Sequence, residues 1–156
     1  MKNRLLLLIS IICIVFILFF LWKEKITLKK VYLSEKYYQE ISDFIEVNDK
    51  DLKTKKKETY LLYTYNSYCL FPVSCDDIFK EFLEEYKIQL LSISFDEFKK
   101  TSFYQKVEYA PSLLIVHKNK VLAYLDANSS TDAVKYQDVE ELKTWIEKYI
   151  YLEKDN

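Results

Sequence analysis

Glycine is absent from this chain of 156 residues, and histidine, proline and cysteine are scarce, with one, two and three copies. At the average usage of about 7%, a chain of this length would contain about eleven glycines. Glycine-rich phosphate loops, dinucleotide-binding fingerprints and glycine-flanked nucleophile turns are therefore excluded. We expect no histidine close to a serine or threonine, so a hydrolase triad is not predicted either.

Arginine is also nearly absent, because Arg4 is the single copy and lysine carries the rest of the positive charge. From Val31 to Asn156, 17 lysines face 23 aspartates and glutamates, a net charge of −6. The one dense basic cluster consists of Lys53, Lys55, Lys56 and Lys57. We interpret it as a solvated loop before a predicted strand. A nucleic-acid-binding surface needs a concentrated excess of positive charge. We therefore predict no nucleic-acid partner.

The longest apolar run is Leu5–Trp22, in which Ser10 is the single polar residue. A helix of this length extends about 27 Å, just enough to cross a membrane. The run continues into Lys23 without the small residues of a signal-peptide cleavage site. A buried core helix would show a polar face, and this run has none. We predict a membrane anchor over residues 1–22, a juxtamembrane linker over 23–30 and a single domain over 31–156.

The orientation of this anchor is not decided by its flanking charges. Lys2 and Arg4 precede the apolar run, and four lysines follow it: Lys23, Lys25, Lys29 and Lys30. A short basic leader, an apolar run and then the whole domain are together typical of an uncleaved export signal. We expect a single-pass protein of the cell membrane with its domain outside the cytoplasm. A domain that faces the cytosol is the alternative.

The clearest helix of the domain is expected to begin at Cys75. Ser74 and Asp77 resemble a capping box, and the apolar positions that follow recur on one helical face: Ile78, Phe79, Phe82, Leu83 and Tyr86. Further helices are predicted over Glu35–Glu46, Phe98–Val107 and Val139–Ile150. Loops are predicted over Asn48–Glu58 and Asp126–Gln137.

Runs that are rich in aromatic and β-branched residues predict five strands: Thr27–Leu33, Tyr60–Tyr65, Ile88–Phe95, Leu113–Val116 and Val121–Leu125. The last two are joined by a tight turn at Lys118–Lys120, in which Asn119 can take the left-handed conformation. Crossover helices require parallel strand pairs, and the hairpin requires an antiparallel one. The predicted fold is therefore α/β, with a mixed sheet flanked by helices.

Two features carry reactive chemistry. Cys69 and Cys75 lie between a strand end and a helix start, with five residues between them, and Ala110-Pro111-Ser112 precedes the strand Leu113–Val116. On these residues the chain resembles the thioredoxin superfamily, over about Lys30 to Leu152. The resemblance implies a thioredoxin-like fold. It further implies an attacking thiol at Cys69, with Tyr68 at the preceding aromatic position, and a resolving thiol at Cys75. Pro111 would be a cis-proline that, with Ala110, places substrate backbone beside the sulfurs.

The chain departs from the family pattern in two ways. The family separates its cysteines by two residues rather than five, and Tyr63 stands where many thioredoxins bury an acid. A helix that begins at Cys75 favours the thiolate of that residue through its N–H groups and dipole. Asp76 and Asp77 oppose this effect because negative charge disfavours a thiolate. We therefore expect a thiol that is less activated than in a standard member.

Other states of the two cysteines stay open. In an exported domain, two nearby cysteines often form a static disulfide, and free or metal-bound thiols are a further alternative. His117 is the single histidine and lies six residues beyond Pro111 along a strand. At 3.3 Å per residue this separation is about 20 Å, far more than one metal ion can bridge. We predict no metal and no cofactor, with His117 at a strand end.

The sequence thus favours a membrane-anchored thiol-disulfide oxidoreductase that acts on protein or peptide thiols and disulfides. Its anchor-plus-domain layout also resembles the bacteriocin transport accessory group, which implies a cysteine-containing secreted peptide as client. The alternative is a non-catalytic accessory or scaffold protein of the same fold, held by a structural Cys69–Cys75 disulfide. Whether such an enzyme oxidises, reduces or isomerises depends on its redox potential.

Overall fold

The structure is a computed structural model that describes residues 29–40, 42–66, 75–126 and 128–154. The predicted anchor Leu5–Trp22 lies outside these residues. Within the described ranges, no helix is long and apolar enough to cross a membrane.

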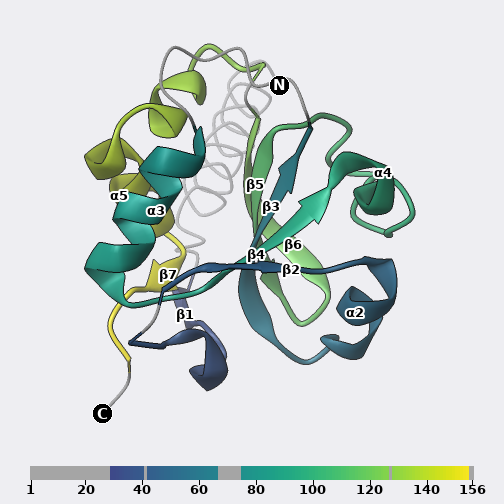
Figure 1. The fold of residues 1–156 in the computed structure, drawn as a ribbon, viewed down its shortest axis with the longest axis horizontal. Helices are drawn as coiled ribbons and strands as arrows, with labels where there is room; N and C mark the ends of the chain where they lie inside the picture. The colour runs from purple at the N-terminus through teal and green to yellow at the C-terminus, as the bar shows by residue number, and fades with distance from the viewer. Residues whose placement is uncertain (1–28, 41, 67–74, 127, 155–156) are drawn as a thin grey trace, which may run out of the picture.

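A mixed sheet forms the centre of the domain (Figure 1). In the described residues its order is β2-β4-β3-β5-β6, and the strands are β2 (Phe44–Glu46), β3 (Thr59–Tyr65), β4 (Leu90–Ser94), β5 (Ser112–His117) and β6 (Lys120–Asp126). β2 and β3 both run parallel to β4, whereas β5 runs antiparallel to β3 and β6. This arrangement confirms the predicted α/β fold with a mixed sheet.

Helices cover both faces of this sheet. Figure 1 shows α3 (Cys75–Tyr86) and α5 (Val139–Ile146) on one side and α2 (Asp49–Thr54) and α4 (Phe95–Phe98) on the other. α3 buries its predicted apolar face, including Ile78, Phe79, Phe82 and Leu83. The predicted strand over Tyr60–Tyr65 and the β5–β6 hairpin are also confirmed. At the hairpin turn, Asn119 has the expected left-handed conformation with φ 62°, and Lys118 shares it with φ 48°.

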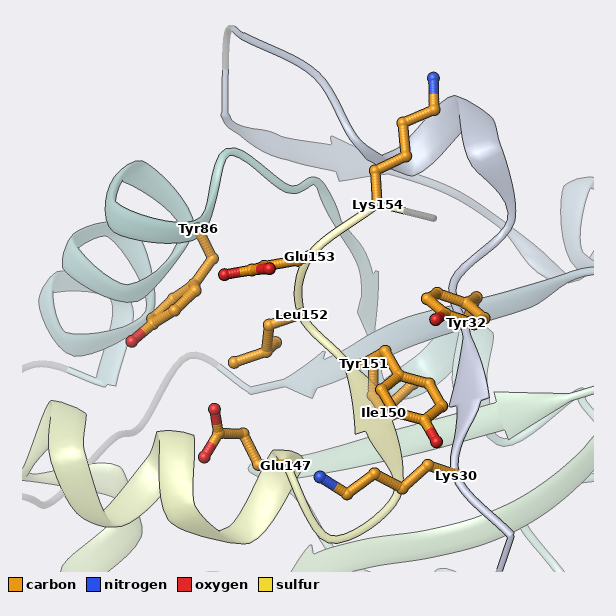
Figure 2. Close-up of a pocket in the computed structure, with 9 residues that line it drawn as sticks. All are labelled: Lys30, Tyr32, Tyr86, Glu147, Ile150, Tyr151, Leu152, Glu153 and Lys154. Carbon is orange, nitrogen blue, oxygen red and sulfur yellow. The ribbon is translucent and has the colours of Figure 1, made fainter. Parts of the chain in front are cut away.

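A second, two-stranded sheet pairs β1 (Val31–Tyr32) with β7 (Ile150–Tyr151) in parallel. Tyr32 and Tyr151 are neighbours on it, with ring centres 4.5 Å apart, and Lys30 Nζ lies 5.5 Å from the centre of the Tyr151 ring. These side chains line a cavity of about 480 Å³ together with Tyr86, the last residue of α3 (Figure 2). The small sheet therefore lies at the C-terminal end of α3.

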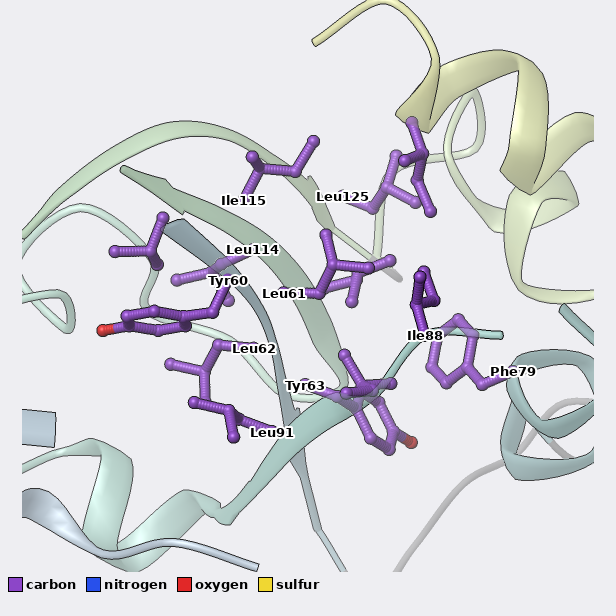
Figure 3. Packing of buried hydrophobic residues seen from close by; sticks show 14 of the residues in the cluster. Tyr60, Leu61, Leu62, Tyr63, Phe79, Ile88, Leu91, Leu114, Ile115 and Leu125 are labelled. Atoms are coloured by element: carbon purple, nitrogen blue, oxygen red, sulfur yellow. The ribbon is translucent and has the colours of Figure 1, made fainter. Parts of the chain in front are cut away.

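The hydrophobic core is centred on β3, which is buried on both faces. Tyr63 faces α3, where its ring meets Phe79 edge-on with ring centres 4.8 Å apart (Figure 3). Alternation along the strand places Thr64 on the opposite face. The continuous apolar run of this strand is what a strand covered by helices on both sides requires.

The predicted helix Glu35–Glu46 is wrong. The segment begins with a short 3-10 helix, η1 (Glu35–Tyr37), and ends in strand β2. Long-range bonds replace helical ones: Gln39 N donates to Lys87 O and Gln89 N donates to Tyr37 O, both at 2.8 Å. The Tyr38 hydroxyl also donates to Tyr151 O at 2.9 Å. Pairing with distant segments has overridden the helical spacing of the apolar residues.

The predicted loop Asn48–Glu58 contains α2, which the sequence reasoning missed. Asn48 Oδ1 accepts hydrogen bonds from Lys50 N and Asp51 N at 2.8 and 3.2 Å. Asp51 Oδ2 in turn accepts from Asn48 N at 3.0 Å. This is a complete capping box. The signal was present in the sequence as Asn48 followed three residues later by Asp51.

Two other helix predictions are wrong in their limits. The helix predicted over Phe98–Val107 is replaced by α4, which begins after Ser94 and ends at Phe98. Ser94 Oγ caps it by accepting a hydrogen bond from Glu97 N at 3.4 Å. Instead of running to Ile150, α5 ends at Ile146, because the chain turns to pair β7 with β1. The predicted loop Asp126–Gln137 contains a further 3-10 helix, η2 (Ala133–Tyr136).

Thr64→Val is expected to stabilise the protein. Thr64 is completely buried, and its Oγ1 has no hydrogen-bond partner among the described residues. A buried hydroxyl without a partner costs about 1–3 kcal/mol, and valine replaces it with a methyl group of the same shape. We expect the free energy of unfolding to rise by about 1 kcal/mol, measured by urea denaturation of the full-length protein in detergent.

The matched control for this experiment is Thr59→Val. Thr59 is also buried, but its Oγ1 is hydrogen-bonded to His117 Nδ1 at 2.7 Å. Loss of that bond should lower the free energy of unfolding by about 1 kcal/mol. A decrease for Thr64→Val as well would contradict the reading of Thr64 as an unsatisfied group.

Candidate functional site

The C-terminal end of β3 and the N-terminal end of β5 meet at one edge of the sheet, where Thr64 pairs with Ser112. Just beyond this pair, Asn66 Nδ2 donates to Ala110 O at 3.1 Å, and Ser112 Oγ donates to Tyr109 O at 2.8 Å. The Ala110–Pro111 peptide bond is cis, as the resemblance implied. The loop that carries Ala110 and Pro111 is therefore fastened to the strand that leads toward Cys69.

Cys75 lies in the first turn of α3 and is only 1% exposed. Asp76 and Asp77 lie beside it in the same turn, and both are exposed. Both carboxylates thus lie in the helical turn that carries Cys75, where the sequence predicts that they oppose the effect of the helix N-terminus.

Tyr136 connects α3, the helix that begins at Cys75, to the strand that follows Pro111. The Tyr136 hydroxyl accepts a hydrogen bond from Leu113 N at 3.0 Å and donates one to Leu125 O at 2.7 Å. Burial raises the pKa of Tyr136 well above its ordinary value, the bond from Leu113 lowers it, and the charges of Cys75, Asp126 and Asp132 raise it again. The Tyr136 ring lies 5.9 Å from that of Phe79 on α3, so Tyr136 lies between this helix and the strand that follows Pro111.

Cys69 and Tyr68 lie outside the described residues. Of the five residues that the sequence singles out, the structure therefore describes Cys75, Ala110 and Pro111. It gives no separation for the two sulfurs, so the proposed pairing of Cys69 with Cys75 stays a prediction.

A cavity of about 370 Å³ adjoins the first turn of α3 and is lined by Asp43, Phe44, Glu46, Tyr63, Tyr65, Asp76, Lys80 and Ser92. Glu46 accepts hydrogen bonds from the Tyr65 hydroxyl and from Ser92 Oγ, both at 2.9 Å. The pKa of Tyr65 is raised by burial, then by this hydrogen bond and by the charges of Glu46 and Asp76. Glu46, on edge strand β2, thus places a carboxylate at this end of the sheet. On β3, Tyr63 stands where the resemblance would place a buried acid.

His117 lies at the other end of β5, as predicted. Burial and the charge of Lys118 lower the pKa of His117. Its bond to Thr59 corrects the expectation that no threonine lies near the histidine, but Thr59 is only 5% exposed and its hydroxyl is out of reach of a substrate. In the part of the chain that the structure describes, no group of three His, Cys, Asp or Glu side chains could hold a metal ion.

Sequence reasoning missed Asn66, Glu46 and Tyr136 as members of this site. Asn66 comes directly after the predicted strand Tyr60–Tyr65, and Glu46 ends the predicted helix Glu35–Glu46. Tyr136 lies in the predicted loop Asp126–Gln137. No local pattern connects them to the cysteines, because the residues that they contact are distant in the sequence.

Comparison of the sequence with models of known protein families gives no match, and comparison with curated proteins gives none either. Several solved structures are similar. A thioredoxin mutant from Entamoeba histolytica is 16% identical with a TM-score of 0.47, covering 65% of this chain and 99% of its own. A thioredoxin from Nicotiana alata is 16% identical with a TM-score of 0.49, covering 71% and 96%.

A thioredoxin mutant from Halobacterium salinarum is 17% identical with a TM-score of 0.49, covering 74% of this chain and 96% of its own. At these identities and TM-scores, the likenesses say nothing about the chemistry of this chain, which depends on its own residues.

Proposed function

We propose that this protein is a thiol-disulfide oxidoreductase that acts through Cys69 and Cys75. The observation that carries the proposal is the burial of Cys75 in the first turn of α3, the helix that packs through Phe79 against Tyr136, whose hydroxyl bonds to Leu113 N just beyond Pro111. A helix N-terminus favours the thiolate of a cysteine that lies there. Cys75 has this location, and Cys69 precedes it by six positions in the sequence.

The proposed reaction transfers two electrons to a client disulfide. The Cys69 thiolate attacks one sulfur of the client, which forms a mixed disulfide and releases the other client sulfur as a thiolate that takes up a proton. The Cys75 thiolate then attacks Cys69 Sγ, so that the second client sulfur leaves and a Cys69–Cys75 disulfide remains. The client is reduced and the protein is oxidised. The reverse sequence oxidises a client dithiol.

The surroundings of Cys75 support this division of roles between the two cysteines. At 1% exposure, Cys75 is unsuited to attack a bulky protein client, but it suits an attack on a bond already formed at Cys69. Asn66 and the Ala110–Pro111 loop lie beside the end of β3 that leads to Cys69, where a client segment would be held. The exposed Tyr109 offers an apolar contact next to them.

The clients that we propose are exported proteins or peptides. This part of the proposal depends on residues 5–22 as a membrane anchor with the domain outside the cytoplasm. A cysteine-containing secreted peptide, as in bacteriocin export, is the client class that this layout favours. Thiol labelling of intact cells with a membrane-impermeant reagent tests the topology, because a domain inside the cytoplasm would stay unlabelled until lysis.

The activity itself is tested with the full-length protein in detergent by insulin reduction and by reactivation of scrambled ribonuclease. We expect the wild type to accelerate at least one reaction and a Cys69→Ser, Cys75→Ser double variant to give only the uncatalysed rate. Titration in glutathione buffers then gives the redox potential, which decides whether the protein oxidises or reduces. If the wild type accelerates neither reaction, the proposal is overturned. The alternative then stands, a non-catalytic scaffold protein with a static disulfide.

A further inference from the structure

We propose that the cavity of about 370 Å³ beside the first turn of α3 binds a basic side chain of the client, a lysine or an arginine, near the client cysteine that reacts. The inference deepens the proposed function and rests on it, because it concerns the chemistry of the client that the same end of the domain would hold. Aromatic rings in the lining, an excess of carboxylates and the place of the cavity in the sheet support it.

Three aromatic side chains line the cavity and lie next to one another. The ring centres of Phe44 on β2 and Tyr65 on β3 lie 6.3 and 6.2 Å from that of Tyr63. Alternation along the strand places Tyr63 and Tyr65 on one face of β3, the face that Phe79 of α3 contacts. Aromatic rings attract an ammonium or guanidinium group within about 6 Å. They also cover the apolar stem of a long basic side chain.

The charged residues of the lining are three carboxylates and one lysine: Asp43, Glu46, Asp76 and Lys80. One positive charge against three negative ones gives the lining a net charge of −2. Within the described residues, none of these four side chains forms an ion pair. A concave surface with an excess of one charge attracts ligands of the opposite charge. A basic side chain of the client would balance this excess.

Glu46 is the carboxylate whose direction is fixed. Its Oε1 accepts a hydrogen bond from the Tyr65 hydroxyl and its Oε2 accepts one from Ser92 Oγ, both at 2.9 Å. Both donors are neutral, so the bonds orient the carboxylate without neutralising its charge. A group that is oriented before binding loses less conformational freedom when the ligand arrives. We therefore expect recognition of the cation to depend most on Glu46.

The cavity lies within reach of a client that is held at the proline loop. Tyr65 immediately precedes Asn66, whose side chain bonds to Ala110 O, and Asp76 immediately follows Cys75. In the sheet, β4 and β2 lie on one side of β3, and β5, which begins after the proline loop, lies on the other. At about 4.8 Å between neighbouring strands, β2 is about 14 Å from β5. An extended client segment covers this distance in about four or five residues.

Binding is tested first without a redox reaction, by NMR titration of the full-length protein in a non-ionic detergent. The probe is n-butylammonium, which has the charged end of a lysine side chain. We expect the amide signals of Phe44 and Ser92 to shift in a saturable way. Glu46→Gln should weaken binding about fivefold, the effect of losing one exposed ion pair. Without a saturable shift in the wild type, the proposal is overturned.

Glu84→Gln is the matched control. Glu84 is an exposed residue of α3 outside the lining of the cavity, and its replacement changes the net charge by the same amount as Glu46→Gln. Binding of n-butylammonium should be the same as in the wild type. Equal weakening in the two variants would mean that net charge alone attracts the probe, and would overturn the proposal.

Lys80→Gln gives a change of opposite sign and keeps the experiment decisive if Glu46→Gln does not fold. Lys80 is exposed and carries the single positive charge of the lining. Its removal leaves three carboxylates, so n-butylammonium should bind more tightly by about the same factor. Unchanged or weaker binding would contradict a cation site.

The choice of client is tested with pairs of synthetic disulfide peptides. One peptide carries a lysine four or five residues from the reacting cysteine, on either side, and the other carries norleucine, which has no charge, in its place. We expect kcat/KM to be about fivefold higher for the lysine peptide with the wild type. The ratio should fall toward one in Glu46→Gln and stay unchanged in Glu84→Gln. Since the ratio is taken within each variant, a general change in turnover cancels.

The two experiments distinguish the inference from the proposed function. Binding of n-butylammonium that depends on Glu46, in a protein that turns over neither peptide, would contradict the proposed function and support a basic side chain as the ligand of the cavity. Turnover without a preference for lysine would support the proposed function and overturn the role of the cavity in client choice.

Discussion

Cys75→Ser is expected to abolish multiple turnover while allowing the protein to capture a client. Without the second thiol, Cys69 can still attack a client disulfide, but nothing within the protein then resolves the mixed disulfide. The expected product is a covalent complex that survives denaturing electrophoresis and disappears on addition of dithiothreitol. Mass spectrometry of peptides from this complex should find the client cysteine joined to Cys69.

Cys69→Ser should behave differently, because the remaining thiol is only 1% exposed. We expect neither turnover nor capture of a protein client by this variant. Cys13→Ser is the matched control, since Cys13 lies in the predicted anchor and should be dispensable for both. Capture by Cys69→Ser and not by Cys75→Ser would reverse the two roles, and equal turnover by all three variants would refute cysteine catalysis.

Phe79→Ala is expected to have the largest effect on stability, a loss of about 3–5 kcal/mol in the free energy of unfolding. Phe79 is 1% exposed and contacts Tyr63 on β3 and Tyr136 on η2, with ring centres 4.8 and 5.9 Å away. Alanine leaves a cavity at the point where helix, sheet and η2 meet. A domain of this size is typically stable by only about 5–15 kcal/mol, so much of its stability should be lost.

Urea denaturation of the full-length protein in detergent measures this loss. Tyr109→Ala is a suitable control, because Tyr109 is an aromatic residue that is 55% exposed. Its replacement should change the free energy of unfolding by less than about 0.5 kcal/mol. Equal effects of the two substitutions would contradict the central place of Phe79 in the core.

The elements that sequence reasoning predicted well are those whose pattern is local. β3 is a continuous run of aromatic and aliphatic residues, and α3 repeats its apolar residues on one face. The hairpin after β5 has Asn119 at a position that favours the left-handed conformation. Each of these segments is specified by its own residues, and tertiary contacts only reinforce them.

The elements that were missed depend on distant partners. Gln39 bonds to Lys87, and Gln89 bonds back to Tyr37, so the segment after η1 is extended although its apolar spacing is helical. The same holds for the site. Cys75, Ala110 and Pro111 could be selected from the sequence because they match a family pattern, whereas the contacts of Asn66 with Ala110 and of Tyr136 with Leu113 span 44 and 23 residues.

The pairing of β1 with β7 has a mechanical consequence. It joins the first described strand of the domain to the last, beside the C-terminal end of α3, whereas Cys75 lies at the other end of that helix. A pulling force that enters the domain at residue 29 would be resisted first by the parallel strands of the small sheet, which are loaded in shear. The central sheet would then keep its register, so a pulling force on a tethered domain would not change the geometry around Cys75.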